Sequence, residues 1–271
     1  MFVIEVPCFN LDQIYNSGQA PRWIQIEQSS TKSKYVIPYK DKSLKIEQHR
    51  DRFDWTKHRL IMSCTEDDFY DTWFHYFDLG FDYSQLNFKI KKMGGKLKTT
   101  AVCGTGIHIL LNQDWFEMFI YTKLVEKVGY DKAKIALNHI AETCGVKHKQ
   151  SMREIGKIVW YEFPSPEMLL KKIDSLKRMG KINKWLRRLC EEIVYKDLSY
   201  SYHENWNDLG KLYGGYDVNT FPTLELERVI KKNFKCKADE FADIYLDGIE
   251  RKGLVYLYIL NFIRCLSKEA K

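Results

Sequence analysis

The chain has 271 residues, of which 45% are hydrophobic and 14% aromatic, so it can bury a substantial core and is not a disordered polypeptide. Its 43 Lys and Arg residues outnumber its 36 Asp and Glu residues, which gives a formal net charge of +7. This moderate excess fits either a phosphate-backbone partner or a generic lysine-rich surface, and it excludes a strongly acidic mimic of DNA.

Residues 1 to about 90 are predicted to be rich in strands. Short, partly alternating segments at Tyr35–Ile37, Ser43–Glu47 and Arg59–Cys64 are separated by polar turn residues. Acidic residues follow Thr65 directly, which is typical of a capped helix start. The aromatic residues that follow from Phe69 at helical spacing are expected to face the core.

From about residue 112 the hydrophobic pattern is mostly helical. Asp114 can cap one helix, a second helix follows Gly129, and Ser165 is the expected cap of a third. More helices are predicted from there to the C-terminal region. The sequence therefore predicts a β-rich N-terminal domain over residues 1–100 and a larger helical domain over residues 101–271.

The seven cysteines are scattered and never occur in C-x-x-C spacing, so neither a zinc site nor a disulfide framework is predicted. Scattered free thiols fit a reducing compartment. The N-terminal residues have no basic stretch before an apolar one, and no window approaches the ~18 apolar residues of a membrane span. We expect a soluble, cytoplasmic protein that needs no metal or other cofactor.

Five stretches, in order along the chain, match the motifs of one family. They are Ser17–Trp23, Trp73–Tyr83, Gly106–Glu117, Tyr161–Glu167 and Gly215–Pro222. Together they resemble the 8-oxoguanine DNA glycosylases, and five matches in order are hard to obtain by chance. The resemblance implies an α+β protein whose antiparallel β-rich N-terminal domain packs on a larger all-helical glycosylase domain. In that family a helix-hairpin-helix grips the DNA backbone and the target base is flipped out of the duplex.

The segments that carry the chemistry in that family differ in this sequence. Leu198–Asn205 stands where the resemblance places the hairpin glycines and the nucleophilic lysine, and it holds neither. Leu224 stands where the family has its catalytic aspartate. Because losing a catalytic group in a covalent mechanism costs several orders of magnitude in rate, we predict that 8-oxoguanine is not excised.

The base-reading positions differ as well. Tyr256 and Leu260 stand where the family has the Gln and Phe that hold the flipped purine, and Val125–Val128 replaces its wedge. Gly18 matches the family glycine whose carbonyl senses the oxidised purine. The resemblance therefore assigns Gly18, Tyr256 and Leu260 to a base pocket of altered chemistry.

Four residues are candidates for relocated catalysis. Lys211 and Asp217 lie in a glycine-rich segment, although a helix end followed by a turn explains this segment better. His203 could act as a general base, but a His beside Tyr and Asn is more typical of a surface. Glu225 lies next to the lost aspartate, and a glycosylase that activates water would need a carboxylate such as Asp217 or Glu225.

Basic residues gather in three places that suit a nucleic-acid surface. The first is the glycine-containing stretch Lys89–Lys98. The second, Lys123–Lys132, matches the region through which the resembling family contacts DNA. The third, Arg178–Arg188, flanks Trp185, which is itself expected in the core. We predict DNA contacts from five lysines: Lys91, Lys92, Lys123, Lys127 and Lys132. A solvated linker or surface is the alternative for each.

These observations favour a protein that binds double-stranded DNA on a glycosylase-like scaffold, without the family's base-excision and lyase activity. The first alternative is a monofunctional DNA glycosylase for a different modified base. The second alternative is a protein-binding inhibitor or adaptor of a DNA-handling machine, which a large exposed apolar patch would favour.

Overall fold

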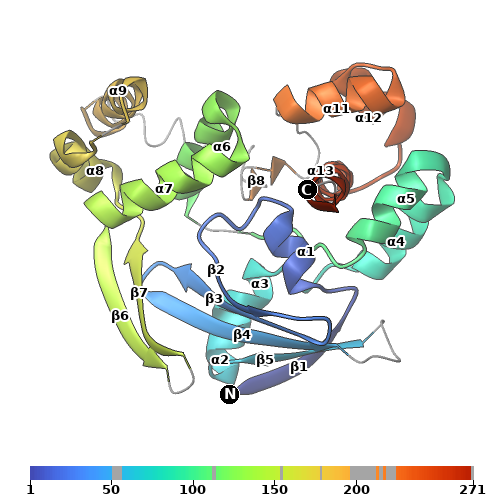
Figure 1. Cartoon of the computed structure of the whole chain (residues 1–271), viewed down its shortest axis with the longest axis horizontal. Coiled ribbons are helices and arrows are strands. Elements are labelled where there is room, and N and C mark those ends of the chain that lie inside the picture. Colours follow the sequence, from blue (N-terminus) through green and yellow to red (C-terminus); the bar gives the residue numbers. More distant parts are fainter. Residues whose placement is uncertain are drawn as a thin grey trace.

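The computed structural model describes residues 1–50, 57–111, 114–152, 155–177, 179–195, 212–213, 216–217 and 224–269. Figure 1 shows a twisted sheet at the bottom of the molecule with most of the helices above it. The predicted α+β class, with an antiparallel sheet at the N-terminus, is confirmed.

Five antiparallel strands form the N-terminal sheet, in the order β1-β5-β4-β3-β2. They are β1 (Phe2–Pro7), β2 (Ile24–Gln28), β3 (Lys32–Tyr39), β4 (Lys42–Arg50) and β5 (Lys57–Met62). A tight turn joins β3 to β4, and its first residue, Lys40, has a φ of 52°, as such hairpin turns require. The register places Tyr35 opposite Ile46, and both side chains are fully buried.

An aromatic core covers one face of this sheet. It includes Phe9, Trp23, Trp73 and Phe77 and is closed by helix α1 (Leu11–Asn16). The short helical segments α2 (Glu66–Asp68), η1 (Phe69–Trp73) and α3 (Phe74–Tyr76) contribute the rest. The predicted cap is present, because the Thr65 hydroxyl accepts a hydrogen bond from the Asp68 amide. The predicted core position of the aromatic stripe is confirmed as well.

A second core lies among the helices. The longer ones are α4 (Tyr83–Lys92), α5 (Gly95–Gly104), α6 (Trp115–Val128), α7 (Tyr130–Cys144), α8 (Pro166–Lys172), α9 (Lys181–Tyr195), α11 (Leu224–Phe234), α12 (Ala238–Tyr245) and α13 (Lys252–Glu269), and η2 (Ile173–Ser175) follows α8. Asp114 and Ser165 cap α6 and α8 as predicted, each accepting from a backbone N–H in the first turn. Helix α4 and the first part of α5 pack in this helical core although they precede residue 101.

Helix α13 is the centre of the helical part. Its residues from Leu254 to Asn261 are all buried, and it packs closely on α5. Figure 1 shows α13 end-on, between α5 and α11, with α1 between it and the sheet. Residues Leu246–Arg251, which include Gly248, separate α12 from α13.

Two hairpins interrupt the helical part. Strands β6 (Val146–Met152) and β7 (Gly156–Glu162) pair antiparallel, as do β8 (Leu212–Tyr213) and β9 (Tyr216–Asp217). Figure 1 shows β6 and β7 running down beside the sheet. Met152, Ile158 and Trp160 pack there with Val36 of β3. The sequence did not predict the β6–β7 hairpin, because its apolar side chains are buried only by contact with the N-terminal sheet, which is distant along the chain.

The described residues hold no helix that is both long and apolar enough to cross a membrane. Within the same part of the chain, no three His, Cys, Asp or Glu side chains gather as metal ligands would. All seven cysteines are free thiols.

Candidate nucleic-acid interface

The segment that begins with Gly18 is held in place by its own side chains. The Gln19 amide donates to the His108 carbonyl over 2.7 Å and accepts from the Leu110 amide over 2.9 Å. The Trp23 indole donates to the Tyr76 hydroxyl over 2.9 Å. This segment is therefore tied to both of the next two motif-like stretches.

Arg22 extends the same network into the helical part. Its guanidinium forms a buried ion pair with Glu117 at 3.0 Å and donates to the Tyr161 carbonyl over 2.8 Å. It also lies 5.9 Å from the centre of the Phe163 ring. Four of the five motif-like stretches thus meet in one network of contacts, and the fifth lies almost wholly outside the described residues.

Glu117 and Asp114 are unusual acids because both are enclosed by the protein. Burial raises the pKa of Glu117 to about 7, although the neighbouring Arg22 opposes this shift. Burial also raises the pKa of Asp114, which caps α6 by accepting from the Glu117 amide. Burial therefore favours the protonated form of the Glu117 carboxyl, whereas the ion pair with Arg22 favours its ionised form.

A third buried acid, Asp78, joins the sheet side to the start of α13. Asp78 forms an ion pair with Arg251 at 2.6 Å and accepts from the Tyr83 hydroxyl over 2.7 Å. Tyr83 stacks on His108 with ring centres 3.7 Å apart, and burial lowers the pKa of His108 to about 3. These groups fix the start of α13 against the sheet-side core and leave His108 neutral.

Gly18 follows α1 in a left-handed conformation, with a φ of 95°. Its carbonyl accepts a hydrogen bond from the Tyr121 hydroxyl of α6 over 2.5 Å. The resemblance makes this carbonyl the group that senses an oxidised purine. In this chain the carbonyl already has a partner, which is a side chain of the protein itself.

Tyr256 and Leu260 lie on α13 and face the helical core. Their exposed fractions are only 3% and 1%, and the Tyr256 ring packs on Phe241 of α12 at 5.8 Å. Burial raises the pKa of Tyr256 to about 12. The structure thus places both predicted pocket residues among apolar side chains, and neither contacts Gly18 through any described hydrogen bond.

Three of the predicted DNA-binding lysines surround the turn between α6 and α7. Lys123 and Lys127 lie on the last two turns of α6, and Lys132 lies in the first turn of α7. Gly129 makes the turn with a φ of 79°, and open space lies where a Cβ would stand. Lys123 forms an exposed ion pair with Glu126 at 3.0 Å.

Lys127 connects this turn to the basic helix α9. Its ammonium lies 5.3 Å from the centre of the Trp185 ring, which is half-buried as part of the adjoining core. Lys181 and Lys184 are exposed on the same helix. We call the set formed by Lys123, Lys127, Lys132, Lys181 and Lys184 the α6–α9 basic surface.

The other two predicted lysines lie elsewhere. Lys91 and Lys92 end helix α4, and the Lys92 ammonium lies 4.4 Å from the centre of the exposed Phe88 ring. Figure 1 shows α4 at the right of the molecule, well apart from α6 and α9 at the left. The structure therefore divides the five predicted lysines into two separate groups.

The catalytic candidates cannot be placed fully. His203 and Lys211 lie outside the described residues. Asp217 ends β9 and Glu225 is the second residue of α11, but their side chains fall outside the described part of the chain. No candidate for catalysis is therefore brought together with another by the described residues.

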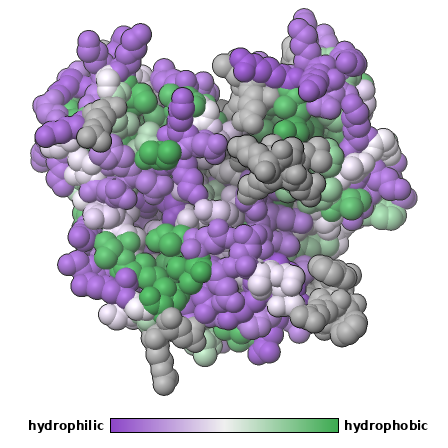
Figure 2. Space-filling view, in the orientation of Figure 1, coloured by the Kyte–Doolittle hydropathy of each residue, from purple (hydrophilic) through white to green (hydrophobic). Residues whose placement is uncertain are grey.

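Figure 2 shows the molecule hollowed at the top, between the lobe that carries α6 and α9 and the lobe that carries α11 and α12. Both lobes present mainly hydrophilic residues to this side. The basic helix α11 contributes exposed Lys231 and Lys232 to the second lobe.

Sequence reasoning missed the partners that complete these arrangements. Tyr121 and Glu117 lie one helical turn apart on the buried side of α6. The ion pair between Glu117 and Arg22 had a signal in the sequence, because two of the motif-like stretches carry side chains of opposite charge. No comparable signal pointed to the contact between Tyr121 and Gly18, since 103 positions separate them.

Comparisons with known proteins agree with this geometry. Residues 1–119 match the family model described as the N-terminal domain of 8-oxoguanine DNA glycosylase. Two similar solved structures are MBOgg1 in complex with a low-affinity DNA ligand, and the Clostridium acetobutylicum 8-oxoguanine glycosylase/lyase with double-stranded DNA containing cytosine opposite 8-oxoG. The first has a TM-score of 0.73 at 22% identity, and the match covers 98% of this chain and 96% of that chain. The second has a TM-score of 0.75 at 20% identity, and the match covers 98% of this chain and 99% of that chain.

A more distant likeness extends to another glycosylase. The 3-methyladenine DNA-glycosylase from Archaeoglobus fulgidus has a TM-score of 0.64 at 13% identity, with 97% of this chain and 99% of that chain covered. No curated protein sequence matches this chain. The fold is therefore that of DNA glycosylases over almost the whole chain.

Proposed function

We propose that this chain, whose residues 1–119 match the N-terminal domain of 8-oxoguanine DNA glycosylase, is a member of that family and binds double-stranded DNA without excising 8-oxoguanine. The similarity of fold covers almost the whole chain. Two proteins with this fold were solved with DNA bound, which supports DNA as the partner.

The observation that carries the proposal is the α6–α9 basic surface. Lys127 lies against Trp185 and so joins the lysines of the α6–α7 turn to those of α9. Ammonium groups on a rigid helical support can contact successive phosphates and release their counterions. The half-buried Trp185 ring gives this surface a fixed shape.

Three features support binding without 8-oxoguanine excision. The Gly18 carbonyl, which the resemblance makes the purine sensor, is bonded to Tyr121. Tyr256 and Leu260 are enclosed in an apolar core. At the sequence level, the positions of the nucleophilic lysine and the catalytic aspartate hold other residues, Leu224 among them.

Fluorescence anisotropy with a labelled duplex, measured across a range of salt concentrations, tests the binding surface. The test variant replaces Lys123, Lys127 and Lys132 by Ala. The matched control replaces Lys147, Lys149 and Lys157 by Ala. These exposed lysines lie on the β6–β7 hairpin, and their substitution removes the same amount of positive charge.

We expect the wild-type protein to bind with an affinity that falls steeply as salt rises. The test variant should lose up to about 0.9 from the log–log salt slope for each phosphate contact removed, and the control should keep the wild-type slope. Equal losses in the two variants would contradict a defined surface and leave only general charge attraction. No salt-sensitive binding by the wild-type protein would contradict the proposed function itself.

A further inference from the structure

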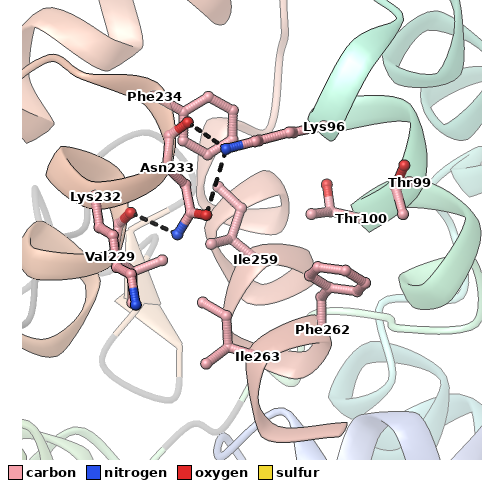
Figure 3. A pocket seen from close by; sticks show the side chains of 10 residues that line it. All are labelled: Lys96, Thr99, Thr100, Val229, Lys232, Asn233, Phe234, Ile259, Phe262 and Ile263. Carbon is pink, nitrogen blue, oxygen red and sulfur yellow. Dashed lines mark hydrogen bonds between the residues drawn. The ribbon is translucent and has the colours of Figure 1, made fainter. Parts of the chain in front are cut away.

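An apolar pocket lies between helices α5, α11 and α13, away from the α6–α9 basic surface. Its cavity volume is about 440 Å³, within the range of about 300–1,000 Å³ that is usual for small-molecule sites. Figure 3 shows α13 below, α11 on one side and α5 on the other, with side chains from all three helices converging on the space. None of the described residues that line it is acidic.

The floor of the pocket is made by α13 and the wall by α11. Ile259, Phe262 and Ile263 point up from α13, and Val229 and Phe234 stand on α11. Ile259 is almost fully buried beneath the others. A ligand seated here would place an apolar body against aliphatic and aromatic carbon, which favours transfer from water.

The rim is basic and polar. The Lys96 ammonium reaches from α5 across the opening and donates to the backbone carbonyl of Asn233 over 2.7 Å (Figure 3). It also lies 3.5 Å from the Asn233 side-chain oxygen. Lys232 is exposed on the α11 side, and the Thr99 and Thr100 hydroxyls lie on the α5 side.

The charge at this rim selects one sign of ligand. Among the lining residues that the structure describes, the two ionisable side chains, Lys96 and Lys232, both carry ammonium groups. An ammonium has three N–H donors, so Lys96 can hold Asn233 and still contact a ligand. A carboxylate at the rim would be attracted to both lysines, whereas an organic cation would be repelled.

We propose that this pocket binds a small organic anion with an apolar body, of the class of medium-chain carboxylates. The chain of the ligand lies on Ile259, Phe262 and Ile263, and its carboxylate faces Lys96 and Lys232. This site is separate from the proposed DNA surface, so the protein has a second ligand-binding function on its opposite lobe.

Isothermal titration calorimetry with decanoate, below its micelle-forming concentration, tests the proposal on the full-length protein. Decylamine serves as the matched ligand, because it has the same chain and the opposite charge at neutral pH. One variant carries Lys96→Met and Lys232→Met, and its control carries Lys98→Met and Lys231→Met. The control lysines are exposed neighbours on the same helices that do not line the pocket.

We expect decanoate to bind the wild-type protein at least about tenfold more tightly than decylamine, and the pocket variant to lose about tenfold of this affinity. The control variant should match the wild type. Lys232→Met alone should weaken binding without disturbing the contact between Lys96 and Asn233. Val229→Trp, which fills the cavity, should abolish binding while circular dichroism and thermal unfolding report an intact fold.

Three results would overturn the proposal. The absence of saturable heat when decanoate is titrated into the wild-type protein, up to roughly millimolar ligand, would contradict the proposed site. Equal affinity for decanoate and decylamine would remove the role of the lysines. Unchanged binding by a folded Val229→Trp protein would place the ligand elsewhere.

Discussion

At the scale of single residues, the buried pair of Arg22 and Glu117 holds the sheet side and the helical side together. The two side chains are 3.0 Å apart and almost fully enclosed. Burial nevertheless raises the pKa of Glu117 to about 7, from an ordinary value of 4.5. The folded protein therefore retains a proton on Glu117 at pH values where the unfolded chain has lost it.

This shift makes stability depend on pH in a definite direction. Between about pH 4.5 and pH 7 the Glu117 contribution to the free energy of unfolding should fall as pH rises, by at most about 1.4 kcal/mol per pH unit. His108 has a lowered pKa of about 3 and gives the opposite slope up to about pH 6.5. The wild-type profile alone therefore does not isolate Glu117.

The measurement is the difference in unfolding free energy between wild type and Glu117→Gln, from urea titrations at several pH values. We expect this difference to decline across pH 4.5–7. Glu126→Gln, on an exposed part of the same helix, is the control and should show no such trend. A flat difference for Glu117→Gln would mean that the pKa of Glu117 is the same in the folded and unfolded states.

Tyr121 is the second residue whose role can be tested singly. Tyr121→Phe removes the donor to the Gly18 carbonyl, and we expect it to cost about 1 kcal/mol of stability. If the freed carbonyl faces the base, the affinity ratio of an 8-oxoguanine duplex to a guanine duplex should rise, by up to roughly fivefold. Anisotropy competition measures this ratio, with Tyr70→Phe at an exposed tyrosine as control. An unchanged ratio would remove Gly18 from base recognition.

At the scale of elements, the close packing of α5 on α13 depends on one glycine. A Cβ on Gly104 would stand 2.5 Å from the Tyr258 ring, which is fully buried and cannot move aside cheaply. We expect Gly104→Ala to lower the unfolding free energy by about 1–3 kcal/mol, measured by chemical denaturation. Gly80→Ala is the control, since its Cβ would meet Phe74 at an ordinary 3.5 Å. Equal stability of the two variants would show that the helices separate easily.

Local signals in the sequence were sufficient for much of the fold. Thr65, Asp114 and Ser165 each cap the helix predicted for them, because a cap depends only on residues within one turn. Three strands of the N-terminal sheet, β3, β4 and β5, were also predicted from short, partly alternating segments, whereas β1 and β2 were not. The β6–β7 hairpin was not, since its polar strand VKHKQSM gains its apolar neighbours only from β3.

The candidate site could be predicted only in part. The lysines around the α6–α7 turn were found from the sequence, but their contact with α9 through Trp185 depends on tertiary packing. The separation of Lys91 and Lys92 from them was likewise invisible. The pocket at Lys96 needs three helices from distant parts of the chain, so no local pattern could reveal it.

At the scale of the whole molecule, the retained motifs belong to the scaffold. Gln19, Arg22 and Trp23 link the sheet-side core to the helical core, so these side chains stabilise the fold. Such contacts are compatible with our proposal that the chain binds DNA without excising 8-oxoguanine, because they do not depend on any catalytic group. Fold alone does not establish activity.

The most direct measurement follows binding and excision in the same sample. The protein is incubated with a labelled duplex that contains 8-oxoguanine opposite cytosine, binding is read by anisotropy, and alkali then converts any abasic site into a strand break. We expect salt-sensitive binding and no breaks above those of the untreated duplex. Breaks that require the protein would contradict the account and would direct attention to Asp217, Glu225 and Lys211 as a rebuilt catalytic site.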